Sequence, residues 1–424
     1  MRFVRACHRI AHRIAAASIA VAAAALPLAA LAAEGLGRSD SERAIESRAQ
    51  QLGNPSYAQR EAATKALIDA GVAARPALER LLDDPDPEIR DRAEKILRVV
   101  IENDFRLRLD AFAADLDGKQ THNLPGWDQF RREIGAEREA RAVFVAMQRA
   151  EPALWEALAA HDPNLSAVFA ERCEEACSVI PQQLEIIERD AAIGSIATLF
   201  FLAGSADVTI DDTDALVLES LIQYPTFEQG LNNRDGVPLD DSLRGAPGFT
   251  SGMRTTFARG IYRRLLSLWL AREGPPVVAM HKLTQALSYD LKDGGVELSR
   301  KLLSRGGGPI EARPYALLTL GRWGGKDDLP LVEGFFGDQE ICINHRISRR
   351  QVQIQVREVA LAVAAHLTGQ DLKSYGYERL QPNAKLLYLA GSLTLGDDAA
   401  KARAFKRWAD WKALRSRGGQ SGGG

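Results

Sequence analysis

The chain has 424 residues, of which 46% are hydrophobic and 26% are charged. This composition is typical of a folded globular protein and excludes a mostly disordered chain, and the length accommodates two or three domains or one long repeat array. The formal net charge of -2 excludes a bulk electrostatic attraction to nucleic acid or to anionic lipid.

The first 33 residues predict a secretory signal peptide. Basic residues precede an uncharged, alanine-rich run over 14–31, and Ala30-Leu31-Ala32 forms a small-x-small cleavage site. The alternative is an uncleaved anchor helix, because the run has about the minimum length that spans a bilayer. Cleavage leaves 50 basic and 56 acidic residues, a net charge of -6. We expect an exported protein, periplasmic or secreted, with no nucleic-acid partner and no stable membrane insertion after cleavage.

Residues 51–105 contain a pattern that returns after thirty positions. An arginine, an alanine and a leucine recur with the same spacing, as Arg60, Ala63 and Leu67 and then as Arg90, Ala93 and Leu97. The apolar spacing predicts a helix over 60–70 that Gly71 ends. A second helix begins around Pro76 and stops at the Asp-Pro pairs of 84–87. Asp86 is expected to cap the helix that starts at Pro87.

The same pattern appears again near the C-terminus. Its members are Arg313, Ala316 and Leu320, followed by Arg357, Ala360 and Ala364. A single helical hairpin cannot bury both of its faces, so hairpins of this kind stack and share one continuous core. The arginines of the pattern are expected to stabilise the repeats by reaching carbonyls at the turn of the neighbouring unit: Arg60, Arg90, Arg313 and Arg357.

Two stretches carry a resemblance to a known family. LGNPSYAQREAATKALIDAGVAARPALERLLDDPDPEIRDRAEKIL and LTLGRWGGKDDLPLVEGFFGD…VQIQVREVALAVAAHLTGQDLKSYGY resemble the HEAT-repeat proteins of planctomycete bacteria. The resemblance covers residues 51–105 and 309–380, and it implies an exported α-solenoid of HEAT-like helical hairpins with no assigned activity. Residues 337–351, which include Cys342 and His345, interrupt the pattern with a longer loop. Residues 341–356 have some β character, but no convincing strand run appears, so the expected fold class is all-α.

Residues 116–305 predict an irregular helical region without clean repeats. Helices are expected over 130–149, 154–160, 165–177, 184–202, 214–224 and 255–272, and a long polar loop over 232–251 is a candidate functional element. The expected organisation is a signal peptide over 1–33, N-terminal repeats over 34–115, this region, C-terminal repeats over 306–415 and a flexible tail over 416–424. A helix over 400–414 is expected to close the repeats, with Phe405, Trp408 and Trp411 facing inward.

Cys173 and Cys177 are four residues apart on a predicted helix. Three interpretations stay open for this pair: two partly buried thiols, a disulfide that an exported compartment would favour, or two ligands of a soft metal. A disulfide at this spacing strains a regular helix. No histidine or further cysteine lies nearby in the sequence to complete four metal ligands.

Two charged clusters have both structural and functional interpretations. Asp211 to Asp214 are expected to cap the following helix, and a calcium site is the alternative. Basic residues on or beside the helix over 255–272, with Lys282 further along, predict a possible polyanion contact, and a solvated helix face is the alternative. The residues of this contact are Arg254, Arg259, Arg263 and Arg264.

The sequence contains no His-Glu-x-x-His, Gly-x-Ser-x-Gly or phosphate-loop motif. We therefore assign no catalytic residue, no metal ligand and no cofactor. The predicted function is a non-enzymatic scaffold that binds a protein or peptide on the surface that stacked hairpins create. The alternative is an enzyme of unknown reaction with a site near 232–264. A lyase or isomerase helper, by analogy with HEAT-like proteins that attach bilin pigments, is a weaker third possibility.

Overall fold

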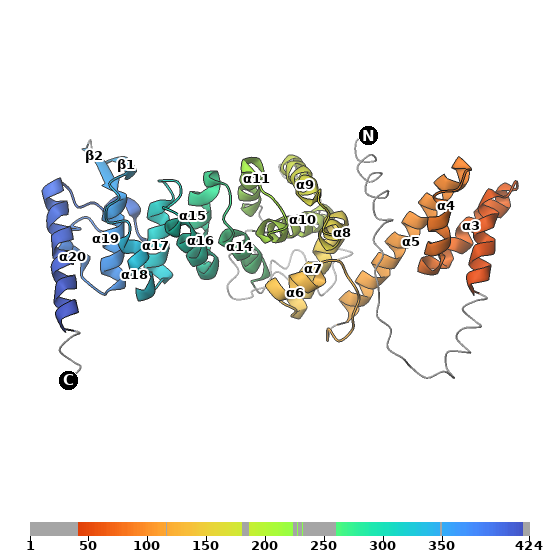
Figure 1. The fold of residues 1–424 in the computed structure, drawn as a ribbon, viewed down its shortest axis with the longest axis horizontal. Coiled ribbons are helices and arrows are strands. Elements are labelled where there is room, and N and C mark those ends of the chain that lie inside the picture. The colour runs from red at the N-terminus through yellow and green to blue at the C-terminus, as the bar shows by residue number, and fades with distance from the viewer. Residues whose placement is uncertain are drawn as a thin grey trace. The chain divides into compact units, whose positions relative to one another are not determined.

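The computed structural model describes residues 41–115, 117–179, 186–223, 227, 231, 260–347 and 350–418. These residues are mostly helical (Figure 1), as the sequence predicts. The described residues divide into two compact units, and the division falls between Arg108 and Leu109. The predicted signal peptide and the predicted loop over 232–251 lie outside the described residues.

In the first unit, the helices begin and end close to the predicted positions. They are α3 (Tyr57–Asp69), α4 (Arg75–Leu81) and most of α5 (Pro87–Ala114), which continues past Arg108. A helical stretch over 41–50 and the short 3-10 turn η2 (Gln51–Gly53) precede α3, and the turn η3 (Gly71–Ala74) lies between α3 and α4. Gly71 has a φ of +58°, a left-handed conformation that glycine adopts without steric cost. The Asp86 carboxylate accepts the Glu88 N–H at 2.8 Å, so Asp86 caps α5 as predicted. The small core of this unit includes Leu52, Leu67 and Leu78.

The second unit contains most of the helices. In chain order they are α6 (Trp127–Glu133), α7 (Arg138–Ala150), α8 (Pro152–Ala159), α9 (Leu165–Val179), α10 (Ile186–Gly204), α11 (Asp212–Ile222), α14 (Ile261–Ala271), α15 (Ala279–Tyr289), α16 (Lys292–Ser304), α17 (Arg313–Trp323), α18 (Leu329–Glu333), α19 (Val356–Leu367) and α20 (Asp398–Gly418). Contacts link α7 to α10, α10 to α14, α14 to α16, α16 to α17 and α17 to α19. In the series α7, α10, α14, α16, α17 and α19, each helix therefore packs against the next member of the series.

The single helix predicted over 130–149 is wrong, because the structure has two helices there. Gly135, between α6 and α7, has a φ of +131°, which a regular right-handed helix does not allow. Glu137 has an extended backbone and precedes α7. The interruption of the apolar stripe at Glu137 and Arg138 thus marks a helix boundary.

Two short antiparallel hairpins depart from the all-α prediction within the described residues. In the first, β1 (Ile341–Ile347) pairs with β2 (Arg350–Gln355), and this hairpin occupies most of the loop predicted over 337–351. Val352 and Ile354 of β2 are buried while Gln351 and Gln353 are exposed, the alternation of a strand with one face on the core. The second hairpin joins β3 (Pro382–Asn383) to β4 (Leu387–Tyr388).

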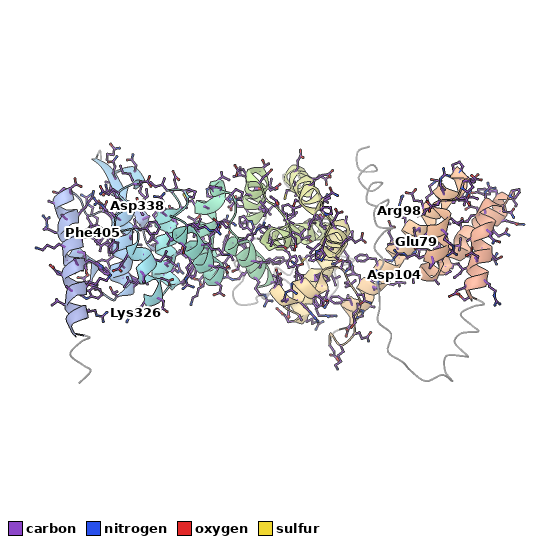
Figure 2. All side chains as sticks on the ribbon, in the orientation of Figure 1. Glu79, Arg98, Asp104, Lys326, Asp338 and Phe405 are labelled. Atoms are coloured by element: carbon purple, nitrogen blue, oxygen red, sulfur yellow. The ribbon has the colours of Figure 1, made fainter. Side chains whose placement is uncertain are left out.

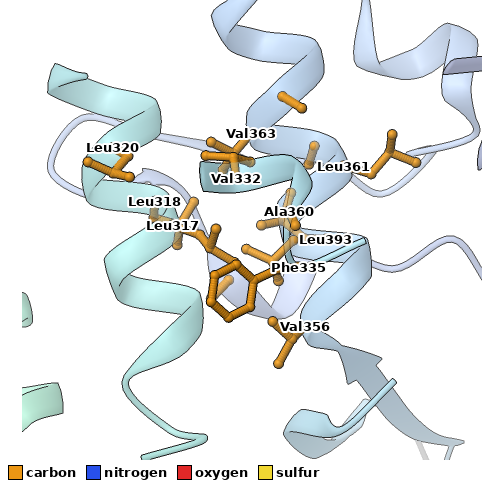
Figure 3. Close-up of a cluster of buried hydrophobic side chains, with 14 of the residues drawn as sticks. Leu317, Leu318, Leu320, Val332, Phe335, Val356, Ala360, Leu361, Val363 and Leu393 are labelled. Carbon is orange, nitrogen blue, oxygen red and sulfur yellow. The ribbon is translucent and has the colours of Figure 1, made fainter. Parts of the chain in front are cut away.

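The core of the C-terminal part lies between α17, α18 and α19. Leucines of α17, including Leu317 and Leu320, meet Val332 of α18 and Val363 of α19 (Figure 3). Alanines such as Ala360 are fully buried in α19, where a small side chain allows neighbouring helices to approach closely. On α20, Trp408 is buried, whereas Phe405 and Trp411 are partly buried against the same core.

Candidate functional site

A cavity of about 890 Å³ lies in the C-terminal part of the second unit. Its walls are β2, the 3-10 turn η7 (Leu372–Tyr375) with the residues that follow it, the segment 394–397 and the first half of α20. Four basic and two acidic side chains line it: Lys373, Arg379, Arg403, Arg407, Glu378 and Asp397. We call it the cationic cavity, because the basic side chains outnumber the acidic ones.

Three of the four cations form neither an ion pair nor a cation–π contact within the described residues. Within the described residues, Lys373, Arg379 and Arg403 form no ion pair, and all three are exposed. Arg407 lies 5.3 Å from the centre of the Tyr375 ring, in a cation–π contact. Of the two acids, Asp397 is already engaged, because its carboxylate accepts the Ala400 N–H at 2.8 Å and caps the start of α20. With four basic and two acidic side chains on its walls, the cavity carries a net positive charge.

Glu358 of α19 fixes three walls of the cationic cavity. Its side chain is fully buried, and its carboxylate accepts the N–H of Gln355 at 2.9 Å and that of Leu395 at 2.8 Å. The Lys401 ammonium of α20 lies 3.7 Å from the same carboxylate. One buried anion thus joins the end of β2, the segment 394–397 and α20.

Sequence reasoning missed this site because its cations come from separate segments. Lys373 and Arg379 lie about thirty residues before Arg403 and Arg407, and only the tertiary fold brings them together. A partial signal was present, since Arg403 and Arg407 are four apart and share one face of a helix.

Two of the predicted repeat-stabilising arginines make equivalent contacts. The Arg60 guanidinium donates to the carbonyls of Asn54 at 2.8 Å and Pro55 at 3.1 Å. Arg90 donates to the carbonyls of Asp84 at 2.5 Å and Pro85 at 2.9 Å. These carbonyls belong to the turn that leads into the arginine's own helix, and for Arg90 this turn also ends the preceding helical pair, α3 and α4. Arg60 Nε also lies 3.3 Å from Glu88 at the start of α5.

The other two arginines differ from this pair and from each other. Arg313 lies 3.3 Å from the Gly308 carbonyl before its helix and forms an ion pair of 2.8 Å with Asp338 in the turn after α18. Arg357 donates to the Gln355 side chain at 2.8 Å and lies 5.9 Å from the Phe405 ring centre, because β2 occupies the place of the turn before α19. Figure 2 labels Asp338 and Phe405.

The predicted polyanion contact is described only in part. Arg254 and Arg259 lie outside the described residues, so the prediction is untested for them. Arg263 donates to the carbonyls of Leu231 at 2.8 Å and Asp290 at 3.1 Å. Arg264 pairs with Glu137, and burial lowers its pKa. Both guanidinium groups thus serve contacts within the fold.

Lys282 lies in the interior rather than beside those arginines. Its side chain is 2% exposed, and its ammonium donates to the carbonyls of Trp269 at 2.9 Å and Arg272 at 2.7 Å. Burial lowers the pKa of Lys282 to about 7, although nearby Glu219 opposes the shift. Burial likewise raises the pKa of Glu219 to about 7, and the Gln285 amide donates to this carboxylate. The sequence analysis did not identify Lys282 and Glu219 as buried groups, because lysine is almost never fully buried.

The predictions for the cysteines have different outcomes. Cys173 is buried in α9, whereas the side chain of Cys177 lies outside the described residues, so the three interpretations of this pair stay open. The Cys342 thiol donates to the Ile354 carbonyl at 3.4 Å, and burial raises its pKa to about 12.

We predict that Cys342 reacts slowly with thiol reagents in the folded protein. Only the thiolate is nucleophilic, and a pKa of about 12 leaves roughly one thiol in 10,000 ionised at pH 8. Alkylation by iodoacetamide, followed by peptide mass spectrometry, should be at least about 100-fold slower than in urea. Equal rates in the folded and unfolded protein would contradict the buried environment of this thiol.

The acidic cluster caps a helix, as predicted. The Asp211 side chain accepts the Asp214 N–H at 2.9 Å, and Asp214 returns a contact to the Asp211 N–H. This reciprocal arrangement is a capping box at the start of α11. Burial raises the pKa of Asp214.

No protein-family model and no curated protein matches the chain. Among the described residues, no helix is both long and apolar enough to cross a bilayer.

Proposed function

We propose that the protein is a non-enzymatic scaffold that binds an acidic segment of a protein or peptide partner in the cationic cavity. The observation that supports this most is the set of three basic side chains, Lys373, Arg379 and Arg403, that surround the cavity without an ion pair among the described residues. Guanidinium groups match carboxylates in a two-point geometry. A partner with several carboxylates therefore fits the charge of the walls.

The proposal extends to the architecture and the location of the protein. The succession of contacts from α7 to α19 supports an α-solenoid of HEAT-like hairpins, in which each pair of helices covers the apolar face of the next. The pattern of residues 1–33 supports export to the periplasm or the extracellular space. There the cavity would be accessible to partners of the cell envelope.

Charge reversal in the cavity tests the binding function. The probe is an eight-residue peptide of alternating glutamate and threonine with blocked ends, titrated by calorimetry at low ionic strength. The double variant Arg379→Glu and Arg403→Glu is expected to weaken binding by at least about 10-fold, because reversed charges both remove attraction and add repulsion. The affinity of the unmodified protein for this peptide should also fall as the salt concentration rises.

Two controls make this test specific. Lys406→Glu changes the charge of an exposed residue of the same helix that does not line the cavity, and it should alter the affinity by less than about 3-fold. A peptide with glutamine in place of glutamate should not bind measurably. If that neutral peptide bound as well as the acidic one, or if the double variant retained full affinity, the proposed function would be wrong.

A further inference from the structure

We infer that the partner segment binds in an extended conformation, as a third strand on the free edge of β2. This inference rests on the proposed function and specifies the conformation of the partner. The sheet has only the order β1-β2, so each strand has one edge that the other does not cover. On β2, the residues Gln351, Val352 and Gln353 form part of the wall of the cationic cavity.

The register of the hairpin determines which backbone groups face this edge. Ile347 pairs with Arg350, and only two residues connect them. The two residues that flank such a short hairpin turn are joined by backbone N–H to C=O hydrogen bonds. Bonded and non-bonded pairs alternate along an antiparallel ladder. The pairs of Gln351 with Arg346 and of Gln353 with Asn344 are therefore non-bonded pairs. The N–H and C=O groups of Gln351 and Gln353 consequently point away from β1.

These outward backbone groups have no partner among the described residues. The hydrogen bond of the Gln351 side chain goes to Asn344 of β1, at 3.0 Å, and so remains inside the hairpin. Unpaired N–H and C=O groups on a strand edge form a template for another strand. Peptide recognition by strand addition uses such an edge for affinity and side-chain contacts for specificity.

The basic side chains across the cavity match the spacing of an added acidic strand. Arg403 and Arg407 are four residues apart on α20, a rise of about 6 Å along the helix axis. Every second side chain of a strand points the same way, at intervals of about 6.6 Å. Carboxylates at alternate positions of the added strand can therefore face these two arginines in turn. The exposed cations also discourage strand pairing between two copies of this surface, because like charges repel.

Backbone methylation of the peptide tests the added strand while the protein stays unchanged. Two forms of the glutamate–threonine peptide carry N-methyl groups, one on its odd-numbered amides and the other on its even-numbered amides. In an added strand only every second N–H faces β2, so one form should lose at least about 10-fold in affinity while the other stays within about 3-fold. Binding of both forms with the affinity of the parent peptide would overturn the inference.

A protein variant gives a second, independent measurement. Gln353→Pro removes an outward N–H that the β1–β2 ladder does not use, whereas Gln353→Ala keeps this N–H and removes only the side chain. The proline variant should bind the parent peptide at least about 10-fold more weakly, and the alanine variant should remain within about 3-fold. Circular dichroism checks that both variants are folded. If the proline variant is unfolded, the methylated peptides alone test whether the partner binds as an added strand.

The outcomes separate the inference from the proposed function. If the parent peptide binds and Arg379→Glu with Arg403→Glu weakens it, but both methylated forms bind equally well, the scaffold function stands and the added strand is wrong. If the parent peptide does not bind at any ionic strength, the proposed function itself fails.

Discussion

Substitution of Glu358 by alanine is expected to lower the free energy of unfolding of the second unit by about 4 kcal/mol. The carboxylate is fully buried and holds the N–H groups of Gln355 and Leu395. The substitution leaves the buried Leu395 N–H and the part-buried Gln355 N–H without their acceptor. The Lys401 ammonium keeps only its ion pair of 3.6 Å with the exposed Asp398. Loss of a buried partner costs far more than loss of an exposed one, because no water takes its place.

Urea denaturation followed by circular dichroism measures this loss. Glu378→Ala is the matched control, since Glu378 is an exposed glutamate of the same cavity, and its removal should change the free energy by less than about 0.5 kcal/mol. A loss below about 1 kcal/mol for Glu358→Ala would contradict the role of this anion. Glu358→Ala should also abolish peptide binding, because the walls of the cationic cavity lose their common anchor.

The buried lysine should give the stability a distinctive dependence on pH. The pKa of Lys282 is lowered from 10.5 to about 7 in the folded state, so above pH 7 the folded state binds fewer protons than the unfolded state. Stability therefore rises with pH from about 7 to 10.5 as the cost of a buried charge disappears. We expect the free energy of unfolding, relative to Lys282→Met, to increase by about 3 kcal/mol between pH 6 and 9.

Glu219 should produce the opposite slope in a lower pH range. Its pKa is raised from 4.5 to about 7, so between these values the folded state binds more protons and stability falls as the pH rises. Relative to Glu219→Gln, the free energy of unfolding should therefore decrease by roughly 3 kcal/mol between pH 4 and 8. The summed contribution of Lys282 and Glu219 to the free energy of unfolding therefore has its minimum near pH 7.

The measurement is urea denaturation of each protein across this pH range. Lys412→Met is the control, because it removes the charge of a lysine whose side chain is 57% exposed. Parallel pH profiles for the unmodified protein and Lys282→Met would show that Lys282 is not desolvated in the folded state. The control variant isolates this effect from the general charge of the protein.

The sequence was most informative where one residue type imposes a local conformation. Gly71 and Pro87 correctly marked a helix end and a helix start, because glycine accepts a positive φ and proline lacks an N–H. The thirty-residue spacing of Arg60 and Arg90 corresponds to equivalent bonds to the preceding turn. These features depend on residues close in the chain, so a single sequence contains them.

The features that the sequence did not reveal depend on contacts between residues that are distant in the chain. The β1–β2 hairpin was not predicted as such, because a short strand pair depends on burial of one face, here Val352 and Ile354, against helices elsewhere in the chain. The cationic cavity assembles basic residues from η7, from the segment that follows η7 and from α20. Burial of Lys282 requires the carbonyls of Trp269 and Arg272, which no local pattern indicates.

The bonds of Arg60 and Arg90 to the turns before their own helices have an evolutionary consequence. Each copy of the motif, counted from the turn before the helix, contains both the arginine that donates these hydrogen bonds and the carbonyls that accept them. A gene duplication or deletion that adds or removes thirty residues would therefore leave every remaining copy intact. The local stability of each helix start would then be independent of how many copies the chain contains.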